Sequence, residues 1–577
     1  MLNPYRRRLK VYGMRMKSVV VLGVLGLALS ADIPAVAQDL PASIGAGDNP
    51  SGAALSAAMA GQVKASAASA DNPLVDDGKA AYDAERYGEA LRLWMPEAEK
   101  GDPSAQFDMG LLYYFGKGVP QDYAKAAEWC QKSADKGLAE AQGSLGLMYA
   151  HGQGVAQNYA TAMGWDRKAA SQNVSHAQIN IGMLYENGRG VPEDYAAAAD
   201  WYKKAADQGA AAGQYDLARL YELGAGVTQD YSAAADLYQK AADQDFAPAQ
   251  YNLGLLYQNG YGVRRDLVAA AGLYRKAADQ GFAGGQHNLA MMYDHGLGVS
   301  LDYAAATAWF RKAADQGLGA AQFNLGLQYE KGRGVPQDYG TALTWFRKAA
   351  AQGLTDAQNN IGAFYEKGYG VTQDYTTAAD WYQKAADQGD ATAQNNLGSL
   401  YHDGRGVPQD DVLAFSWYKK SADQGWAQGQ HNLGVAFMNG LGHSQDHAAA
   451  AEWFRKAADQ GIAEAQYSLG TLYVLGQGVP QDYALAASWT RKAADQGFAD
   501  AQYNLGLFYA LGMGVKQDYI QAYKWSSLAV SHASSTEIRS KATQNKRGAA
   551  GFMTAAQVAK AEALAKAWKP VVATPGA

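Results

Sequence analysis

A pair of glycines that recurs every 36 residues is the feature that most limits what this chain can fold into. The first glycine of each pair lies, without one insertion or deletion, at Gly116, Gly152, Gly188, Gly224, Gly260, Gly296, Gly332, Gly368, Gly404, Gly440, Gly476 and Gly512. The second follows two residues later. A fixed period in the range of about 20–50 residues is typical of stacked structural units. The sequence therefore predicts a repeat protein whose units bury apolar surface against one another.

Each unit reads as two short helices. In the copy that begins at Ala321, this residue, Leu325 and Tyr329 are spaced by four residues and share one face of a first helix. Gly326 lies beside that face. Glycine lowers helix propensity by about 1 kcal/mol, so we expect it there because a neighbouring helix approaches closely.

The loop and the second helix of this copy carry equally clear signals. Gly332 and Gly334 are predicted to end the first helix at positive φ, and Asp338 to cap the second helix. Asp holds this capping position in eleven copies, and Asn in the other. Trp345 or Phe346 is expected in the apolar stripe of the second helix. Trp stands at the position of Trp345 in ten copies, which predicts a large buried anchor between helices.

The repeated pattern AxAQxxLGxxYxxGxGVxxDYxxAxxWxxKAAxQG closely resembles the Sel-1-like repeat family, a relative of the tetratricopeptide repeat with a longer inter-helix loop. The resemblance covers about Asp77 to Ala529. The expected fold is an all-α, right-handed α-solenoid of twelve 36-residue helix-turn-helix repeats with terminal capping helices. The resemblance implies a protein that binds other proteins.

The amino terminus has the pattern of an export signal. Six Lys or Arg residues precede an uncharged apolar run from Val19 to Leu29, and Ala35-Val36-Ala37 form a small-x-small cleavage site. The run is shorter than the roughly 20 residues that span a bilayer as a helix. We therefore expect a cleaved signal peptide, no membrane span in the mature chain, and a periplasmic or secreted protein of a Gram-negative bacterium.

The rest of the chain divides into four predicted segments. They are a disordered linker (38–75), an N-terminal capping half-repeat (76–101), the twelve repeats (102–535), and a polar linker with a C-terminal helix and tail (536–577). The linker is rich in Ala, Ser and Gly and has no aromatic residue, so it cannot bury enough apolar surface to offset its ordering entropy. Near the other end, Ser531–Gly551 reads as a polar stretch, and Thr554 with Gln557 as a capping box.

Charge and cysteine usage exclude several functions. The formal net charge is -6, and no basic face of the kind that binds nucleic acid is apparent. The single cysteine, Cys130, excludes an intramolecular disulfide framework and a cysteine zinc site. His443 and His447 straddle a loop and a helix cap, so we interpret them as variation of the loop. No catalytic residue, metal or cofactor is predicted.

The candidate binding residues lie one position after the recurring Ala-Gln pair, on the side of the first helix opposite its core stripe. Six aromatic residues and two histidines occupy this position: Phe107, Tyr215, Tyr251, His287, Phe323, His431, Tyr467 and Tyr503. In a stacked array they would line the concave groove and bind a partner through exposed rings. The alternative is that these rings cover the helix of the neighbouring repeat. Glu186, Glu222, Asp294, Glu330 and Glu366, seven residues further on, would favour a basic or hydroxyl-rich partner or are simply solvated.

The function expected from these features is a non-enzymatic scaffold or adaptor that binds a protein in the groove. Family resemblance implies roles in envelope-complex assembly, signalling or exopolysaccharide regulation. A polysaccharide- or peptidoglycan-binding solenoid and a host-interacting secreted factor are the alternatives. The glycan interpretation predicts that binding is lost when Tyr251 and Tyr467 are both replaced by Ala.

Overall fold

The computed structural model describes residues 72–571 of the chain, and every regular element in that range is an α-helix. The described residues form two compact units that divide between Gln337 and Asp338. The predicted signal peptide and residues 38–71 of the predicted linker lie outside the described range. Within that range, no helix is both long and apolar enough to cross a membrane.

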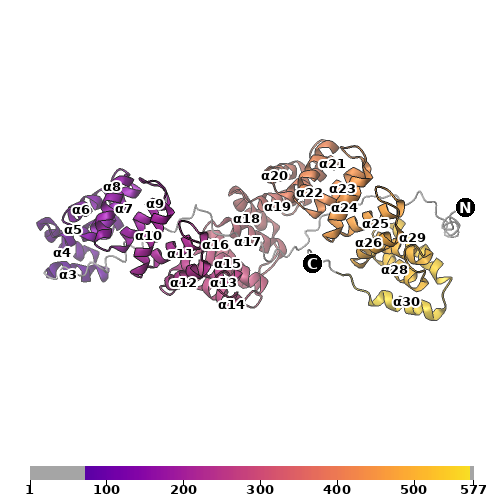
Figure 1. The fold of residues 1–577 in the computed structure, drawn as a ribbon, viewed down its shortest axis with the longest axis horizontal. Coiled ribbons are helices and arrows are strands. Elements are labelled where there is room, and N and C mark those ends of the chain that lie inside the picture. Colours follow the sequence, from indigo (N-terminus) through magenta and orange to yellow (C-terminus); the bar gives the residue numbers. More distant parts are fainter. Residues whose placement is uncertain (1–71, 572–577) are drawn as a thin grey trace. The chain divides into compact units, whose positions relative to one another are not determined.

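The helices follow one another in pairs (Figure 1). The unit that ends at Gln337 contains α3 (Pro73–Asp83), α4 (Tyr87–Lys100), α5 (Pro103–Phe115), α6 (Tyr123–Asp135), α7 (Ala139–His151), α8 (Tyr159–Ser171), α9 (Ser175–Glu186), α10 (Tyr195–Asp207), α11 (Ala211–Leu223), α12 (Tyr231–Ala242), α13 (Ala247–Asn259), α14 (Leu267–Asp279), α15 (Ala283–His295), α16 (Tyr303–Asp315) and α17 (Gly319–Lys331).

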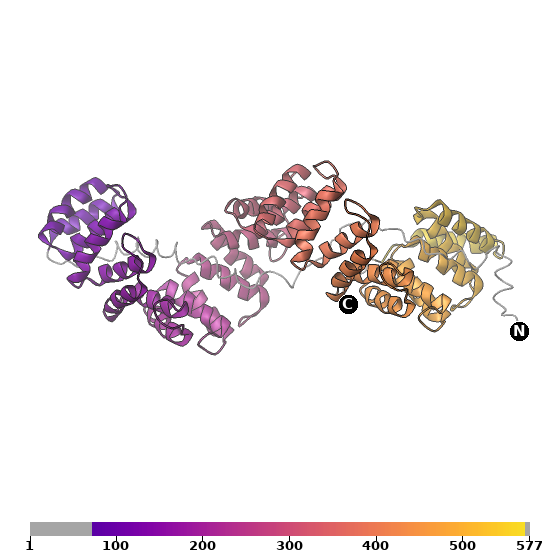
Figure 2. The ribbon, with the colours of Figure 1, turned by 90° about the horizontal axis from the view of Figure 1, so that it is seen from above.

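The unit that begins at Asp338 continues the same alternation, which Figure 2 shows from above. It contains α18 (Tyr339–Ala351), α19 (Thr355–Lys367), α20 (Tyr375–Asp387), α21 (Ala391–Asp403), α22 (Asp411–Asp423), α23 (Ala427–Asn439), α24 (His447–Asp459), α25 (Ala463–Leu475), α26 (Tyr483–Asp495), α27 (Ala499–Leu511), α28 (Tyr519–His532), α29 (Thr536–Ala550) and α30 (Ala555–Ala567). The chain is an all-α solenoid.

Loop glycines and helix caps lie where the sequence predicts that the helices end and begin. The first glycine of the loop ends its helix in the left-handed region, with φ of 67° at Gly116 and 65° at Gly332. The second glycine also has positive φ, 71° at Gly154, and a Cβ there would collide with the backbone of Tyr123 at the start of the preceding second helix. Asp122 caps that helix by accepting a hydrogen bond of 3.0 Å from the Lys125 backbone N–H.

The buried anchor of the second helix is the residue after the tryptophan. Tyr202, for example, is completely buried, whereas the preceding Trp201 is half-buried. The Lys204 ammonium covers the open face of that tryptophan, with its Nζ 3.6 Å from the ring centroid. The prediction that the tryptophan is the buried anchor was therefore wrong for most repeats, because the helix directs its neighbour toward the core and leaves the indole at the rim.

A glycine in the first helix makes room for this buried ring, where the sequence predicted the close approach of a neighbouring helix. A Cβ at Gly182 would lie 2.5 Å from Cε1 of Tyr202, and one at Gly254 would lie 2.7 Å from Cε1 of Tyr274. Atoms cannot approach so closely without displacement. The ring therefore packs directly on the backbone of the first helix, and glycine is kept there despite its low helix propensity.

Both ends of the described chain carry helix pairs that depart from the repeat. At one end, α3 packs against α4, where Trp94 is buried and donates a hydrogen bond of 3.0 Å from Nε1 to the Val75 backbone oxygen. At the other, α30 begins with the expected capping box of Thr554 and Gln557.

The segment that we expected to be a polar stretch is largely helical. Residues 536–550 within it form α29, which packs against α28. Ala542, Asn545 and Ala549 are buried on its inner face, and Asn545 Nδ2 donates a hydrogen bond of 2.8 Å to Ser526 Oγ. Its apolar stripe consists of alanines, which composition alone does not distinguish from a linker.

We predict that Gly254→Ala destabilises the protein, while Gly272→Ala in the same repeat stabilises it. The first substitution forces the Tyr274 ring to move and should cost about 1–2 kcal/mol, since Ala218 is accommodated at the equivalent position of another repeat. Gly272 lies mid-helix with nothing within 4 Å of the position of an added Cβ, so alanine there should add about 0.5–1 kcal/mol. Thermal unfolding followed by circular dichroism measures both. Equal effects of the two substitutions would contradict the close-packing account.

Candidate functional site

The eight predicted groove residues are not an exposed track. Phe107, Tyr251, His287 and Tyr503 are buried, with at most 7% of their surface exposed. Tyr215, Phe323, His431 and Tyr467 are half-buried. The interpretation of these rings as an open aromatic surface was therefore wrong, and the alternative, that they cover a neighbouring repeat, agrees with the structure.

Several of these rings pack on the second helix of their own repeat or on the residue that precedes the next first helix. The Tyr251 ring lies 5.9 Å from that of Tyr274 on the second helix and 5.3 Å from that of Phe282, which caps the following first helix. His287 lies 5.6 Å from Phe310 in the same way. Burial lowers the pKa of His287 to about 4, so its ring is neutral near pH 7. Replacing such residues creates cavities, so Tyr251→Ala cannot separate binding from folding.

The predicted acidic face also has a structural role. Glu222 accepts a hydrogen bond of 2.7 Å from the buried Tyr238 hydroxyl, and Glu366 accepts one of 2.7 Å from Tyr382. In one repeat Gln258 replaces the carboxylate and accepts a bond of 2.8 Å from Tyr274. A buried phenol needs an acceptor, and these side chains supply it from sixteen residues earlier in the chain.

The recurring glutamine of the Ala-Gln pair ties the helices of each repeat together. Gln250 Nε2 donates a bond of 3.2 Å to the Ala242 backbone oxygen, and its Oε1 accepts one of 2.8 Å from Gln280 Nε2. The same pairing joins Gln430 and Gln460 at 2.8 Å. Sequence reasoning assigned no role to this residue. The signal that could have revealed this role is the amide side chain itself, which recurs at the same position in every repeat.

An asparagine row lies along the first helices, beside the predicted groove positions. We give this name to Asn360, Asn396, Asn432 and Asn504, which recur at the repeat spacing and are half-buried. Asn396 Nδ2 donates a bond of 3.1 Å to Asn359 Oδ1 of the preceding repeat, and Asn432 Nδ2 one of 2.8 Å to Asn395 Oδ1. Each of these bonds uses one of the two amide N–H groups. The row therefore presents amide groups that are only partly satisfied within the protein.

Several titratable groups are buried in the first repeats. Asp108 is 1% exposed, both of its carboxylate oxygens lack a hydrogen-bond partner among the described residues, and burial raises its pKa to about 8. Burial also raises the pKa of the Cys130 thiol to about 12, which makes it an unreactive group near pH 7. Among the described residues, no three His, Cys, Asp or Glu side chains gather in a way that could hold a metal ion.

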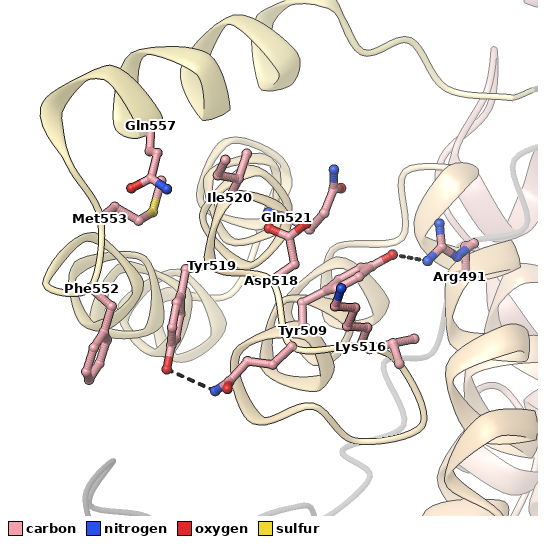
Figure 3. Close-up of a pocket in the computed structure, with 12 residues that line it drawn as sticks. Arg491, Tyr509, Lys516, Asp518, Tyr519, Ile520, Gln521, Phe552, Met553 and Gln557 are labelled. Carbon is pink, nitrogen blue, oxygen red and sulfur yellow. Dashed lines mark hydrogen bonds between the residues drawn. The ribbon is translucent and has the colours of Figure 1, made fainter.

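A hollow of about 750 Å³ lies beside the start of α28 (Figure 3). Tyr519 and Phe552 stack at its edge, with ring centroids 4.7 Å apart. The same arrangement joins Tyr339 to the loop residue Tyr369 at 4.6 Å, so Phe552 takes the place of a loop from a further repeat. Arg491 in its wall donates a hydrogen bond to the Tyr509 hydroxyl. The hollow therefore lies between the last repeat and the turn that joins α29 to α30.

Comparison with known proteins identifies the repeat. The Sel1 repeat model matches the chain twelve times, at residues 103–138, 139–174, 175–209, 211–246, 247–282, 283–318, 319–354, 355–390, 391–426, 427–462, 463–498 and 499–534. A solved structure of a protective antigen present in uropathogenic Escherichia coli strains, which displays an SLR fold, is 38% identical. That match covers 77% of this chain and 94% of the antigen, with a TM-score of 0.65.

A Sel1 repeat protein from Oxalobacter formigenes is 36% identical over 54% of this chain and 89% of its own, with a TM-score of 0.42. No curated protein matches the chain.

We predict that Glu222→Ala destabilises the protein and that Glu222→Gln does not. Alanine leaves the buried Tyr238 hydroxyl without its acceptor, which costs about 1–3 kcal/mol, whereas glutamine supplies the acceptor that Gln258 already provides to Tyr274. Urea unfolding of the two variants beside the parent measures the difference. A glutamine variant as unstable as the alanine variant would show that the negative charge, and not the hydrogen bond, matters.

We predict that Asp108→Asn removes a pH-dependent loss of stability. With a pKa of about 8 in the folded state and about 4 when unfolded, this carboxyl stabilises the fold below pH 4 and loses that contribution as pH rises toward 8. The slope from this group alone is at most about 1.4 kcal/mol per pH unit. The melting temperatures of variant and parent should diverge from pH 4 to pH 8 and stay apart above it. The exposed Asp236→Asn is the control, and a parallel profile for Asp108→Asn would refute the assignment.

Proposed function

This chain belongs to the Sel1 repeat family, and on that basis we propose that it is an exported, non-enzymatic scaffold that holds a partner protein along the asparagine row. Sel1 repeats generally mediate protein binding. The row, not the aromatic positions, is the part of the first-helix face that we assign to the partner.

The observation that carries this proposal is the regular array of half-buried amides. Asn396 and Asn432 recur 36 residues apart and each uses a single N–H group toward the preceding repeat. An amide offers two donors and an acceptor, so donors and acceptors recur along the helices at a fixed interval. An extended peptide segment has backbone N–H and C=O groups at a fixed interval too. Hydrogen bonds to that backbone would hold a segment without requiring one particular side chain.

The non-enzymatic part of the proposal is supported by what the polar side chains already do. Tyrosines bond to glutamates, glutamines bond to backbone carbonyls, and aspartates cap helices, each at an equivalent place in successive repeats. A catalytic centre needs unlike groups that converge on one reacting atom. Repetition of like groups at equal intervals suits binding along a length of chain.

The glycan alternative has lost its basis. It requires exposed rings on which sugars could stack, and Tyr251 and Tyr503 are buried. The proposal therefore names a protein partner. Export is also part of the proposal. The signal pattern that supports it ends at Ala37 and lies outside the described residues. Amino-terminal sequencing of the protein recovered from the periplasm or medium should begin at Gln38, and an intact amino terminus found in the cytoplasm would refute it.

We predict that a photo-crosslinking amino acid placed at Asn360 or Asn504 captures a distinct protein from the cell envelope, while one placed at the exposed Glu452 on a second helix does not. Mass spectrometry identifies the captured protein. Asn396→Ser with Asn432→Ser should reduce the capture severalfold without unfolding the chain, since Ser468 and Ser144 occupy the same position in other repeats. Equal capture from Glu452, or capture unaffected by the serine variants, would overturn the proposal.

A further inference from the structure

Repeats that share one backbone geometry can be compared position by position. At one loop edge, the residue types differ from those of most other copies. Val268, the second residue of α14, is 68% exposed, whereas most copies have Ala, Ser, Gly or Thr there. Leu301 in the following loop is 55% exposed, at a position that is Gln in nine of the twelve copies. Exposed aliphatic residues at positions where small or polar ones suffice have no role in the stacking.

The same edge carries two arginines. Arg264 and Arg265 are exposed and occupy positions that are mostly Pro, Thr or Ser and Gln, respectively, in other copies. Arg265 Nε donates a bond of 3.0 Å to the Gln258 backbone oxygen, which replaces the bond that Gln229 makes to Glu222. Arg264 makes no hydrogen bond or ion pair within the described part of the chain. In a chain of net charge -6, this pair is a local positive region.

The loop geometry places these residues on one continuous edge. The turn at Gly262 packs on the start of α12, and the ring of Tyr261, which is 51% exposed, contacts that of Tyr231 at a tilt, with centroids 5.1 Å apart. The turn at Gly298 packs on the start of α14, where a Cβ would lie 2.9 Å from the Val268 backbone nitrogen. Leu301 follows that turn by three residues. We name Tyr261, Arg264, Arg265, Val268 and Leu301 the loop-edge patch.

Among the described residues, neither nearby carboxylate forms an ion pair with the two arginines. Asp266 accepts hydrogen bonds of 2.9 Å from the backbone N–H groups of Val268 and Ala269, so its charge serves the start of α14. Asp302 caps α16 in the same manner. The arginines are therefore available to carboxylates from outside, and the aliphatic side chains between them to apolar side chains.

We propose that the loop-edge patch binds a segment of a partner protein that carries carboxylates beside aliphatic or aromatic side chains. Arginine pairs carboxylates through two parallel N–H donors, which positions a peptide side chain and gives it orientation. Two arginines supply too little charge for lasting attachment to an anionic membrane, which takes clusters of roughly four to eight basic residues. This site lies on the loops and does not depend on the asparagine row.

The test uses the full processed chain and a phage-displayed library of random peptides. Peptides that bind the parent are counter-selected on a charge variant, Arg264→Thr with Arg265→Gln, and an apolar variant, Val268→Ala with Leu301→Gln. Each substitution introduces a residue that another repeat carries at the same position, so folding should be retained, as melting temperature will show. We expect the selected peptides to contain Asp or Glu next to Leu, Ile or Phe. Their Kd by fluorescence anisotropy should rise about tenfold on either variant and also as salt increases.

The matched control is Val412→Ala. Val412 occupies the position of Val268 and is 65% exposed, but Pro408 and Gln409 replace the arginines before it. Peptide binding should be unchanged in this variant. The proposal is overturned if no peptide depends on both residue pairs, or if Val412→Ala weakens binding equally. It is also overturned if the patch instead supports binding to phosphatidylglycerol vesicles or self-association in sedimentation. These peptide-binding results do not depend on whether crosslinkers in the asparagine row capture a protein.

Discussion

Eight of the twelve repeats carry Tyr or Phe directly after the tryptophan position, and packing of this buried ring on the preceding helix is the interaction on which the rest of their structure depends. The Tyr202 ring occupies the space of the missing Gly182 side chain, since a Cβ there would lie 2.5 Å from Tyr202 Cε1. Once the ring is buried, its hydroxyl needs an acceptor, which Glu186 provides at 2.6 Å. In this repeat one contact thus links glycine, tyrosine and glutamate, and other repeats meet the same needs with other residues, such as Gln258 as the acceptor for Tyr274.

Repeat 2 shows what happens when the ring is absent. Asp166 stands in place of the tyrosine, is completely buried, and accepts a bond of 3.2 Å from Asn180 Nδ2 of the following repeat. Burial holds its pKa well above the usual value for aspartate. On the same junction, Gly143 replaces an aromatic residue, and the His176 ring occupies the space where its Cβ would be. Where one repeat lacks a large side chain, a larger side chain from the next repeat fills the space. The space between two neighbouring repeats must therefore be filled as a whole.

The same distinction explains what the sequence could and could not predict. Helix ends at Asp122 and Gly116 are local events set by a few neighbouring residues, and repetition makes such signals unmistakable. The environment of Tyr251 is not local. A helical wheel places it opposite the core of its own helix, but Phe282, 31 residues later, covers it. Positions on a solenoid helix face three neighbours, and the wheel describes only one. The α29 helix escaped prediction for a related reason, since its small alanine stripe acquires meaning only against α28.

It follows that a side chain in this fold can serve a partner only if stacking has not already used it. The glutamates and the rings at the predicted groove positions already make contacts between helices of the stack. The asparagines use part of their hydrogen-bonding capacity in this way, and the exposed loop-edge residues make few such contacts. Where stacking demands nothing, the residue type is free to vary from copy to copy, as it does between Val268 and its equivalents. Comparing copies within the chain therefore separates structural from available positions without reference to any other protein. A residue that departs from its equivalents while remaining exposed, such as Arg264, carries more information about function than one that recurs in every repeat.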